Sequence, residues 1–492
     1  MRYEAVIGME VHAQLLTKSK MFCRCSADYA AAEPNTHVCP VCLGMPGVLP
    51  VINRKAVEYT IMTALALNCQ IPQYSKFDRK NYFYPDLVKG YQISQYDLPL
   101  SRDGWLEVEA SPRGSARGVD GERCRIGIRR VHLEEDTAKL VHVHRGGESY
   151  SLVDFNRSGV PLMEIVSEPD IRSPEEARLY LLKLRTIMRY LGVSTGDMEK
   201  GAMRCEANVS LRPVGAGEYG TRVEIKNLNS FRSVKLALEY EIERQRRILE
   251  EGGTIEQETM GWDEARNITV LQRSKEYADD YRYFPEPDLP PLILSREWVE
   301  GIRARLPELP DAKLERFVRE YGLSRYDAGV LVTERAVADY FEECVKAGTG
   351  RVEPKAIANW VTGELFRLMK AKEAEIGQVE ITPDRLVALI GLVQDGTISI
   401  TAAKEVFAEV FEAGRAPDEI VRERGLAQIS DLAELSSIVD EVIAANPKPV
   451  ADHRGGKEQA LGFLVGQVMR ATRGKANPKV VNELLLEKLK RE

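Results

Sequence analysis

The chain has 492 residues, of which 44% are hydrophobic and 29% are charged, a composition typical of globular proteins with about two to four domains. It shows no charged and apolar leader and no apolar run long enough to cross a bilayer, so we expect a cytoplasmic protein without a membrane partner. The net charge of −7 gives no overall sign of nucleic-acid binding.

The stretch from Tyr3 to His12 predicts a strand with one apolar and one polar face, because apolar and polar residues alternate along it. Glu10 and His12 therefore point to the same side, where a carboxylate and an imidazole could form half of a metal site. The alternative is a solvated strand face that carries two polar residues. From these two residues alone, the alternative is favoured.

Four of the eight cysteines lie within twenty residues, as Cys23-x-Cys25 and Cys39-x-x-Cys42. In a cytoplasmic protein this spacing predicts a tetrahedral zinc knuckle over residues 23–42 that stabilises the fold, with His37 as a possible substitute ligand. Four unrelated thiols are the alternative. A redox pair is less favoured, because neither pair has the context of a thioredoxin motif.

Residues 53–68 have apolar residues at helical spacing, and the stretch that follows, 76–100, is dense in polar and aromatic residues that include Arg79 and Lys80. Such a stretch suits a surface that faces a ligand, and an irregular tyrosine-rich edge is an equally favoured alternative. Several strands are predicted between 105 and 155. Three acids end one of these strands together, namely Glu134, Glu135 and Asp136.

Glu164 lies inside an otherwise apolar strand predicted at 161–166, where a carboxylate needs a partner or a metal because an unpaired buried charge is costly. A further alternating run over 203–212 places Arg204 and Glu206 on one face. The string G-x-G-x-x-G at 215–220 matches the dinucleotide-binding fingerprint. We interpret it as a hairpin turn, because the residues after it are strand-like and offer no helix N-terminus for a pyrophosphate.

Helices are predicted from residue 174, with Ser173 as the N-cap, to about 191, and from Ser230 to about 251. The proline cluster at 285–291 is followed by a helical composition, so we expect a catalytic domain over 1–293, a helical domain over 294–413 and a helical tail over 414–492. Further helix starts are expected near Ser295, Pro310, Ser324, Pro354 and Pro383.

The tail is basic, since residues 453–492 carry nine Lys and Arg against four Asp and Glu, an excess of +5 that leaves −12 for the rest of the chain. Such a segment can meet a polyanion. The residues expected to do so are Arg470, Arg473, Lys475 and Lys479.

If the acidic strand faces converge, their carboxylates would repel each other unless divalent cations lay between them. Oxygen ligands favour magnesium, and the imidazole leaves manganese possible. With cations nearby, such a cluster suits phosphoryl transfer, in which positioning and charge neutralisation carry most of the catalysis. The expected ligands are Glu10, His12, Glu135, Glu164 and Glu206, and the expected cations are Arg79, Lys80, Arg204 and Lys226.

Several long strings closely resemble the B subunit of the aspartyl/glutamyl-tRNA amidotransferase, and the resemblance extends over essentially the whole chain. These strings are G-M-E-V-H at 8–12, F-D-R-K-N-Y-F-Y-P-D at 77–86, H-L-E-E-D at 132–136, L-V-D-F-N-R-S-G-V-P-L-M-E-I-V-S-E-P-D at 152–170, D-D-Y-R-Y-F-P-E-P-D at 279–288 and G-F-L-V-G-Q-V-M-R-A-T-R-G-K-A-N-P at 462–478.

The resemblance implies an α+β fold with a glutamine-synthetase-like antiparallel β cradle, an all-helical domain and a small tRNA-binding tail. It implies a subunit that uses ATP and Mg²⁺ to phosphorylate the side-chain carboxylate of Glu-tRNA(Gln) or Asp-tRNA(Asn) and then replaces the phosphate with ammonia. Glu10, His12 and Glu135 are then expected to act in catalysis, with Glu134 as the alternative to Glu135 because a strand end can turn either acid inward.

The resemblance also implies a heterotrimer, in which a glutaminase A subunit supplies ammonia and a small C subunit clamps the two larger chains. The sequence agrees, because it has no G-x-S-x-G elbow and no recognisable Cys and His pair for a glutaminase. Two other functions remain open, a tRNA-binding chaperone without catalysis and a free-standing kinase of a small carboxylate. The sequence does not decide which misacylated tRNA is the substrate.

Overall fold

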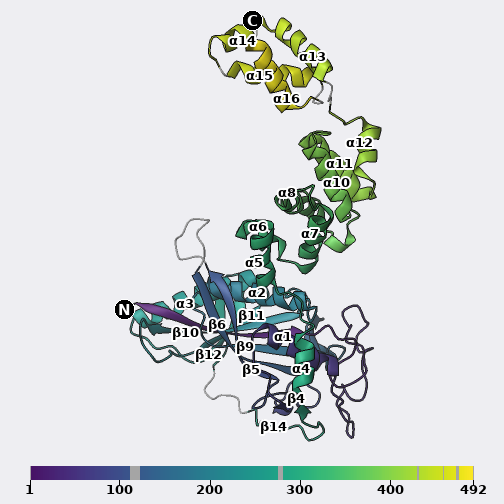
Figure 1. Ribbon diagram of the computed structural model, residues 1–492. Helices are drawn as coiled ribbons and strands as arrows, with labels where there is room; N and C mark the ends of the chain where they lie inside the picture. The colour runs from purple at the N-terminus through teal and green to yellow at the C-terminus, as the bar shows by residue number, and fades with distance from the viewer. Residues whose placement is uncertain are drawn as a thin grey trace. The chain divides into compact units, whose positions relative to one another are not determined.

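A computed structural model describes residues 2–110, 122–274, 281–428, 432–457, 459–472 and 476–490. The chain divides into two compact units, Met1–Leu309 and Pro310–Glu492 (Figure 1). The first unit is built on a large β-sheet and the second is helical. The predicted α+β class is therefore confirmed.

The first unit is organised around an eight-stranded sheet with the strand order β13-β12-β11-β10-β1-β9-β6-β5. Neighbouring strands are antiparallel except β11 and β12, which are parallel because the helix α3 crosses between them. The strands are β1 (Tyr3–Gln14), β5 (Ser101–Ala110), β6 (Glu122–Glu135), β9 (Pro161–Ser167), β10 (Met203–Pro213), β11 (Val223–Leu228), β12 (Glu258–Asp263) and β13 (Ile268–Ser274).

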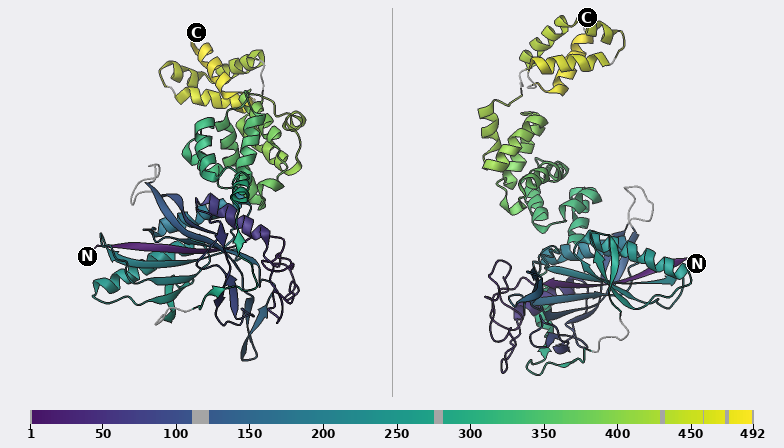
Figure 2. Two further views of the ribbon diagram at one scale, coloured as in Figure 1. Left: turned by 60° about the horizontal axis from the view of Figure 1, so that its bottom comes forward. Right: turned by 180° about the vertical axis from the view of Figure 1, so that it is seen from behind.

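One face of this sheet is buried under helices and the other carries the polar residues. Along β1 the side chains of Met9, Val11 and Ala13 are buried, while Glu10 and His12 between them are partly exposed, as the alternation predicts. The helices α2 (Pro174–Leu191) and α3 (Phe231–Glu250) pack on each other and on the sheet (Figure 2). The polar face is thus left open for a ligand.

The predicted helix ends in this unit are confirmed. The hydroxyl of Ser173 accepts a hydrogen bond from the Glu176 amide at the start of α2, and Ser230 caps α3 in the same way through the amide of Ser233. The helix α1 (Arg54–Ala66) lies within the predicted 53–68. The glycines at 215–220 connect the antiparallel strands β10 and β11, as expected of a hairpin turn.

Smaller sheets border the large one and bring distant segments together. The strand β3 (Asp78–Asn81) lies between β4 (Tyr91–Ser94) and β14 (Phe284–Pro285), which joins residues near 80 to residues near 284. The remaining strand pairs are β2 (Tyr74–Ser75) with β15 (Leu292–Ile293) and β7 (Lys139–Arg145) with β8 (Glu148–Asp154).

The boundaries of the hydrophobic cores differ from the domain boundaries expected at residues 293 and 413. The helix α4 (Arg296–Arg303) buries Val299 and Ile302 in the core of the first unit, so this unit extends beyond residue 293. In the second unit, Ile420 and Val421 of α12 (Pro417–Arg424) belong to the same core as residues 317–411, whereas a separate core begins at Leu435. Apolar side chains on α4 and α12 explain both differences.

The second unit begins its helices where the sequence predicts, since Pro310, Pro354 and Pro383 are first residues and Ser324 is an N-cap. No helix in the described ranges is long and apolar enough to span a membrane. The other helices are α5 (Pro310–Tyr321), α6 (Arg325–Leu331), α7 (Arg335–Ala347), α8 (Pro354–Trp360), α9 (Phe366–Lys372), α10 (Pro383–Gln394), α11 (Ile400–Ala413), α13 (Leu432–Ala445), α14 (Pro447–Arg454), α15 (Gln459–Ala471) and α16 (Pro478–Lys490).

Candidate active site

The polar face of the sheet gathers carboxylates and imidazoles from three adjacent strands. Glu164 in the middle of β9 is the direct cross-strand neighbour of His12 on β1 and of His132 on β6. The Oε2 atom of Glu164 lies 3.2 Å from Nε2 of His12 and 3.3 Å from Nε2 of His132. Glu134 lies two residues after His132, and its Oε1 is 3.6 Å from Nε2 of His12.

Two sets of possible metal ligands share Glu164. One set is Glu10, His12 and Glu164, and the other is His132, Glu134 and Glu164, with the ligand atoms of each set within 4.8 Å of one another. Carboxylate oxygens with one imidazole in each set fit Mg²⁺ or Mn²⁺. The two sets could therefore hold the cations that the acids need between them.

The structure corrects the expected position of Glu135. Successive residues of a strand point to opposite sides, so Glu134 enters the cluster and Glu135 leaves it. The Oε1 atom of Glu135 accepts a hydrogen bond of 3.1 Å from the Ile93 amide and forms an ion pair with Lys89. Glu135 lines a different cavity, of about 220 Å³, which it shares with Cys23 and Cys42. The expectation that it joins the other acids is wrong.

Glu206 lies opposite Glu10 in the pairing of β1 with β10, as expected, and lines the same cavity as the two ligand sets. It belongs to neither set. Both of its carboxylate oxygens instead accept hydrogen bonds of 2.8 Å from Lys226. Lys226 therefore balances the charge of Glu206 on this side of the cluster.

Burial and close contact shift the pKa values of the cluster. Burial, together with the charge of Glu164, raises the pKa of Glu10 to about 7. Burial alone would lower the pKa of His12, but its hydrogen bond to Glu164 and the nearby acids raise it to about 9. The imidazoles of His132 and His12 hold the pKa of Glu164 well below its usual value, although burial opposes this. At neutral pH, His12 therefore carries a proton and Glu10 is partly protonated, and a divalent cation would have to displace these protons.

The cavity over this cluster, here called the central cavity, has a volume of about 430 Å³ and contains several cations. Three of the four expected ones, Lys80, Arg204 and Lys226, line it. Arg204 donates a hydrogen bond of 2.9 Å to Asp136. Burial alone would lower the pKa of Lys80, but Glu134 and other acidic neighbours raise it above its usual value. These groups are charged at neutral pH and can bind a phosphate.

The expectation for Arg79 is wrong. Its Nε donates a hydrogen bond of 2.6 Å to Glu286, its guanidinium lies 4.2 Å from the centre of the Tyr91 ring, and it does not line the central cavity. Adjacent residues of β3 alternate, so Lys80 points into the cavity and Arg79 points away. Arg79 therefore connects β3 to the segment around residue 286, and its role is structural.

The central cavity continues into two neighbouring cavities. One, here called the arginine cavity, has a volume of about 340 Å³, and Arg129, Arg130 and Arg222 contribute to its lining. The other, here called the aromatic cavity, has a volume of about 690 Å³. Its lining includes Tyr82, Phe83, Tyr84 and Tyr281.

The sequence analysis missed His132, Arg130 and Arg222. A signal was present for the first two, because Arg130 and His132 precede Glu134 at intervals of two residues in one strand and therefore share its face. Arg222 stands one residue before β11, where alternation gives no information.

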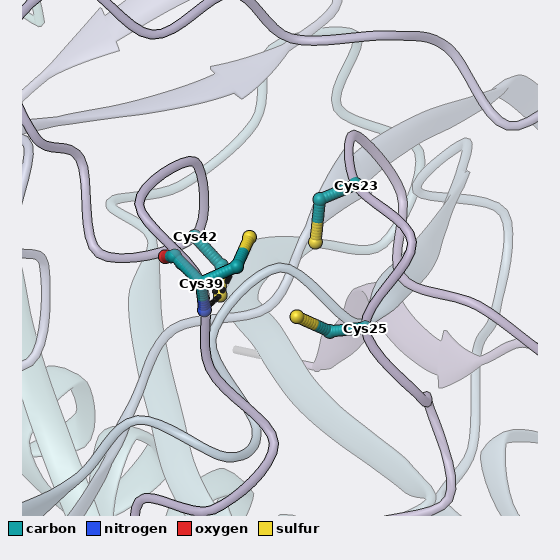
Figure 3. Close-up of side chains that lie close together, drawn as sticks. All are labelled: Cys23, Cys25, Cys39 and Cys42. Atoms are coloured by element: carbon teal, nitrogen blue, oxygen red, sulfur yellow. Dashed lines mark hydrogen bonds between the residues drawn. The ribbon is translucent and has the colours of Figure 1, made fainter.

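The four expected cysteines form a second cluster. The sulfur atoms of Cys23, Cys25, Cys39 and Cys42 lie within 4.8 Å of one another and point toward a common centre (Figure 3). Four thiolates at this spacing fit a tetrahedral zinc ion. His37 is not part of the group.

A buried lysine lies against this cluster. Lys20 has no exposed surface, and its ammonium group donates hydrogen bonds to the Cys42 sulfur at 3.6 Å, the His37 carbonyl at 2.8 Å and the Phe155 carbonyl at 3.3 Å. An ammonium group has three N–H donors, and all three are used. If a metal is bound, the negatively charged cysteine thiolates that hold it would supply the counter-charge that the buried ammonium group needs.

The fold and the site define an α+β protein with a cluster of acids and histidines on the open face of its sheet, and comparisons with known proteins identify its family. A family model described as the GatB/GatE catalytic domain matches residues 5–300, and one described as the GatB domain matches residues 339–489. The chain is also 59% identical over 488 residues to a protein of Carboxydothermus hydrogenoformans and 62% identical over 489 residues to one of Thermomicrobium roseum, covering 99% of both chains in each case.

Both relatives are named as the B subunit of an aspartyl/glutamyl-tRNA(Asn/Gln) amidotransferase, as is a protein of Moorella thermoacetica that is 58% identical over 489 residues. The chain belongs to this family of amidotransferase B subunits. The family and enzyme class predicted from the sequence are thereby confirmed.

Proposed function

We propose that this chain uses ATP to phosphorylate the side-chain carboxylate of Glu-tRNA(Gln), Asp-tRNA(Asn) or both, and then forms the amide with ammonia. The observation that carries the proposal is the pair of ligand sets that share Glu164 beneath a cavity lined by Lys80 and Arg204. Acids that hold cations, together with fixed positive charges, are what phosphoryl transfer needs.

In the first step, an oxygen of the substrate carboxylate attacks the γ-phosphorus of ATP and ADP leaves. Magnesium held by Glu10, His12, Glu134, Glu164 and His132 would neutralise the phosphate oxygens. Lys80 and Arg204 provide further positive charge, and Asp136 orients Arg204. In the second step, ammonia attacks the acyl carbon and phosphate leaves.

We assign the triphosphate of ATP to the arginine cavity. Arg130 and Glu10 line both this cavity and the central cavity, so a chain of phosphates can extend from one to the other. The guanidinium groups of Arg129, Arg130 and Arg222 suit phosphate oxygens. This assignment adds three residues to those expected from the sequence.

We propose that ammonia comes from a glutaminase A subunit, with a small C subunit completing a heterotrimer in the cytoplasm. Three of the four cysteines outside the four-cysteine cluster are buried and make poor nucleophiles. Burial raises the pKa of the Cys69 and Cys344 thiols to about 12, and it also raises the pKa of Cys205. Zinc in the cysteine cluster would stabilise the fold and take no part in the reaction.

The test is a comparison of neighbouring acids in the reconstituted complex. Glu134→Gln should abolish ADP formation that depends on charged tRNA, because it removes a ligand from one set. Glu135→Gln should retain it, because that side chain faces away. Basal glutaminase activity of the partner serves as the folding control. Equal ADP formation by Glu134→Gln and the unchanged complex would refute the assignment.

The same assay separates the two other functions. A tRNA-binding chaperone would form no ADP with any charged tRNA, whereas a free-standing kinase of a small carboxylate would form ADP without tRNA. Assays with Glu-tRNA(Gln) and Asp-tRNA(Asn) separately would identify the substrate.

A further inference from the structure

The aromatic cavity opens directly beside the central cavity. Five residues line both, namely Tyr82, Thr137, Glu224, Lys226 and Tyr281. A molecule that fills the aromatic cavity therefore lies next to the carboxylates that carry the chemistry. The larger volume of this cavity, about 690 Å³, leaves room for a group as large as a nucleoside.

Large aromatic rings at this cavity are exposed in a way that packing does not explain. The side chain of Phe83 is 81% exposed and that of Tyr84 is 63% exposed, in the segment without regular secondary structure that follows β3. Single exposed hydrophobic residues are ordinary, but adjacent exposed rings beside a catalytic cavity indicate a binding surface.

The start of the segment that carries these rings is bonded to residues 281 and 282. The side-chain amide of Asn81 donates a hydrogen bond of 2.8 Å to the Arg282 carbonyl, and the Asn81 backbone amide donates one of 2.9 Å to the Tyr281 carbonyl. The rings of Tyr82 and Tyr281 meet edge to face with their centres 6.0 Å apart. The aromatic wall is thus formed before any ligand arrives, which reduces the entropy lost on binding.

Two hydroxyl groups in the cavity are bonded to neighbouring acids. The hydroxyl of Thr137 donates to Asp86 at 3.1 Å, and the hydroxyl of Thr259 donates to Glu224 at 2.8 Å. The exposed rings of Phe83 and Tyr84 are therefore available to a ligand, and Lys226, which is paired with Glu206, lies where the aromatic cavity meets the central cavity. A flat heterocycle joined to an anionic backbone fits this combination.

We propose that the aromatic cavity binds the 3′-terminal adenosine of the aminoacyl-tRNA, with its base stacked on Phe83 or Tyr84. The inference rests on the proposed function, because the amino acid is esterified to the terminal ribose. When its side chain reaches Glu164 and His12, the attached adenosine must lie just outside the central cavity. The arginine cavity is better suited to a triphosphate, so the aromatic cavity remains for the nucleoside.

The test uses the assembled complex and uncharged tRNA in which the terminal adenine is replaced by 2-aminopurine, whose fluorescence is quenched by stacking. We expect quenching on binding to the unchanged complex and its loss in the Phe83→Ala, Tyr84→Ala double variant. Stacking of one base contributes a factor of roughly 5 to 150 in affinity, and the variant should bind complete tRNA more weakly by such a factor. Tyr326→Ala, which removes an 80% exposed ring from the second unit, is the control.

A tRNA that lacks the terminal adenosine should bind the unchanged complex and the double variant equally well. Three results would overturn the proposal. The first is quenching that survives in the double variant, and the second is a raised apparent dissociation constant for ATP while that for tRNA stays unchanged. The third is failure of the complex to assemble. The last outcome would assign the rings to packing between subunits. Amide formation by the unchanged complex is measured in parallel, so failure of the proposed function is seen separately.

Discussion

Replacement of Lys20 by Met tests the role of the buried ammonium group beneath the four cysteines. Methionine has nearly the length of lysine, so the change removes the charge and the three donors and leaves little empty space. The carbonyls of His37 and Phe155 lose their partner, as does the Cys42 sulfur. The two kinds of acceptor predict two separate effects.

The sulfur determines the effect on zinc binding. A hydrogen bond to a charged group is worth about 1.5–3 kcal/mol. The Cys42 thiolate is favoured even without metal, because its hydrogen bond with Cys23 and the charge of Lys20 lower its pKa to about 4, but a bound metal ionises the other three thiols as well, so the ammonium group then faces more negative charge. Lys20→Met should therefore weaken zinc binding, by up to roughly 150-fold. The carbonyls are present with and without zinc, and each buried unpaired carbonyl costs about 1–3 kcal/mol. Thermal stability should therefore fall in both states.

Competition with a chelator of known affinity measures the first effect, and thermal unfolding of zinc-loaded and zinc-free protein measures the second. Lys18→Met is the matched control, because Lys18 is exposed and lies two residues away. Unchanged zinc affinity in Lys20→Met would show that the ammonium group does not compensate the charge of the cluster, and the reasoning would be refuted.

Four further predictions concern metals, stability and tRNA. Metal analysis should find about one zinc per chain, and Cys39→Ser should lower stability before it affects ADP formation; a folded, metal-replete protein without zinc would contradict this. Mg²⁺ binding should strengthen as the pH rises toward 9 and release protons, because it requires neutral His12, with a pKa of about 9, and ionised Glu10, with a pKa of about 7. The His12 contribution to metal-free stability should be complete below pH 6.5 and lost as the pH rises through about 9. Calorimetry in buffers of different ionisation enthalpy measures the proton release on Mg²⁺ binding, and unfolding measured across pH tests the loss of stability. Replacing Arg470 and Lys479 should weaken the binding of uncharged tRNA and change turnover at saturating tRNA little. The slope of the logarithm of the binding constant against the logarithm of the salt concentration should become shallower by roughly one unit for each phosphate that is no longer neutralised. An unchanged slope would indicate a solvated tail. Arg473 and Lys475, expected to act with them, lie outside the described residues.

The sequence predicts which strand residues face the central cavity, because that depends on regular alternation, but it does not predict that Glu206 pairs with Lys226 and joins neither ligand set. Glu10, His12, Glu164 and Glu206 lie inside strands, and a period of two assigns each to a face without knowledge of the tertiary structure. The helix starts were equally predictable, because Ser and Pro act on neighbouring backbone groups. Local chemistry was sufficient for these features.

The positions that the sequence predicts wrongly, or does not predict, are fixed by contacts between residues far apart in the chain. Alternation along β6 places Glu135 on the side of Val131 and Leu133, but the end of a strand can depart from it, and the contacts that fix Glu135 there, with the Ile93 amide and Lys89, belong to another segment. Arg79 lies in a strand of four residues, too short to show a period, and its partner Glu286 is far away in sequence. The aromatic cavity depends on the pairing of Asn81 with residues 281 and 282. No pattern within a single segment contains this information.

The opposite directions of Glu134 and Glu135 have a consequence for changes in chain length. Deletion of one residue within β6 upstream of these acids would shift the register by one position and exchange the two sides of the strand. Glu135 would then enter the central cavity, Glu134 would face Lys89, and His132 would leave Glu164. The charges at both sites would be almost unchanged while the ligand sets were destroyed. We therefore expect β6 to tolerate many substitutions outside its ligands and no single-residue insertion or deletion, which a library of such variants could measure directly.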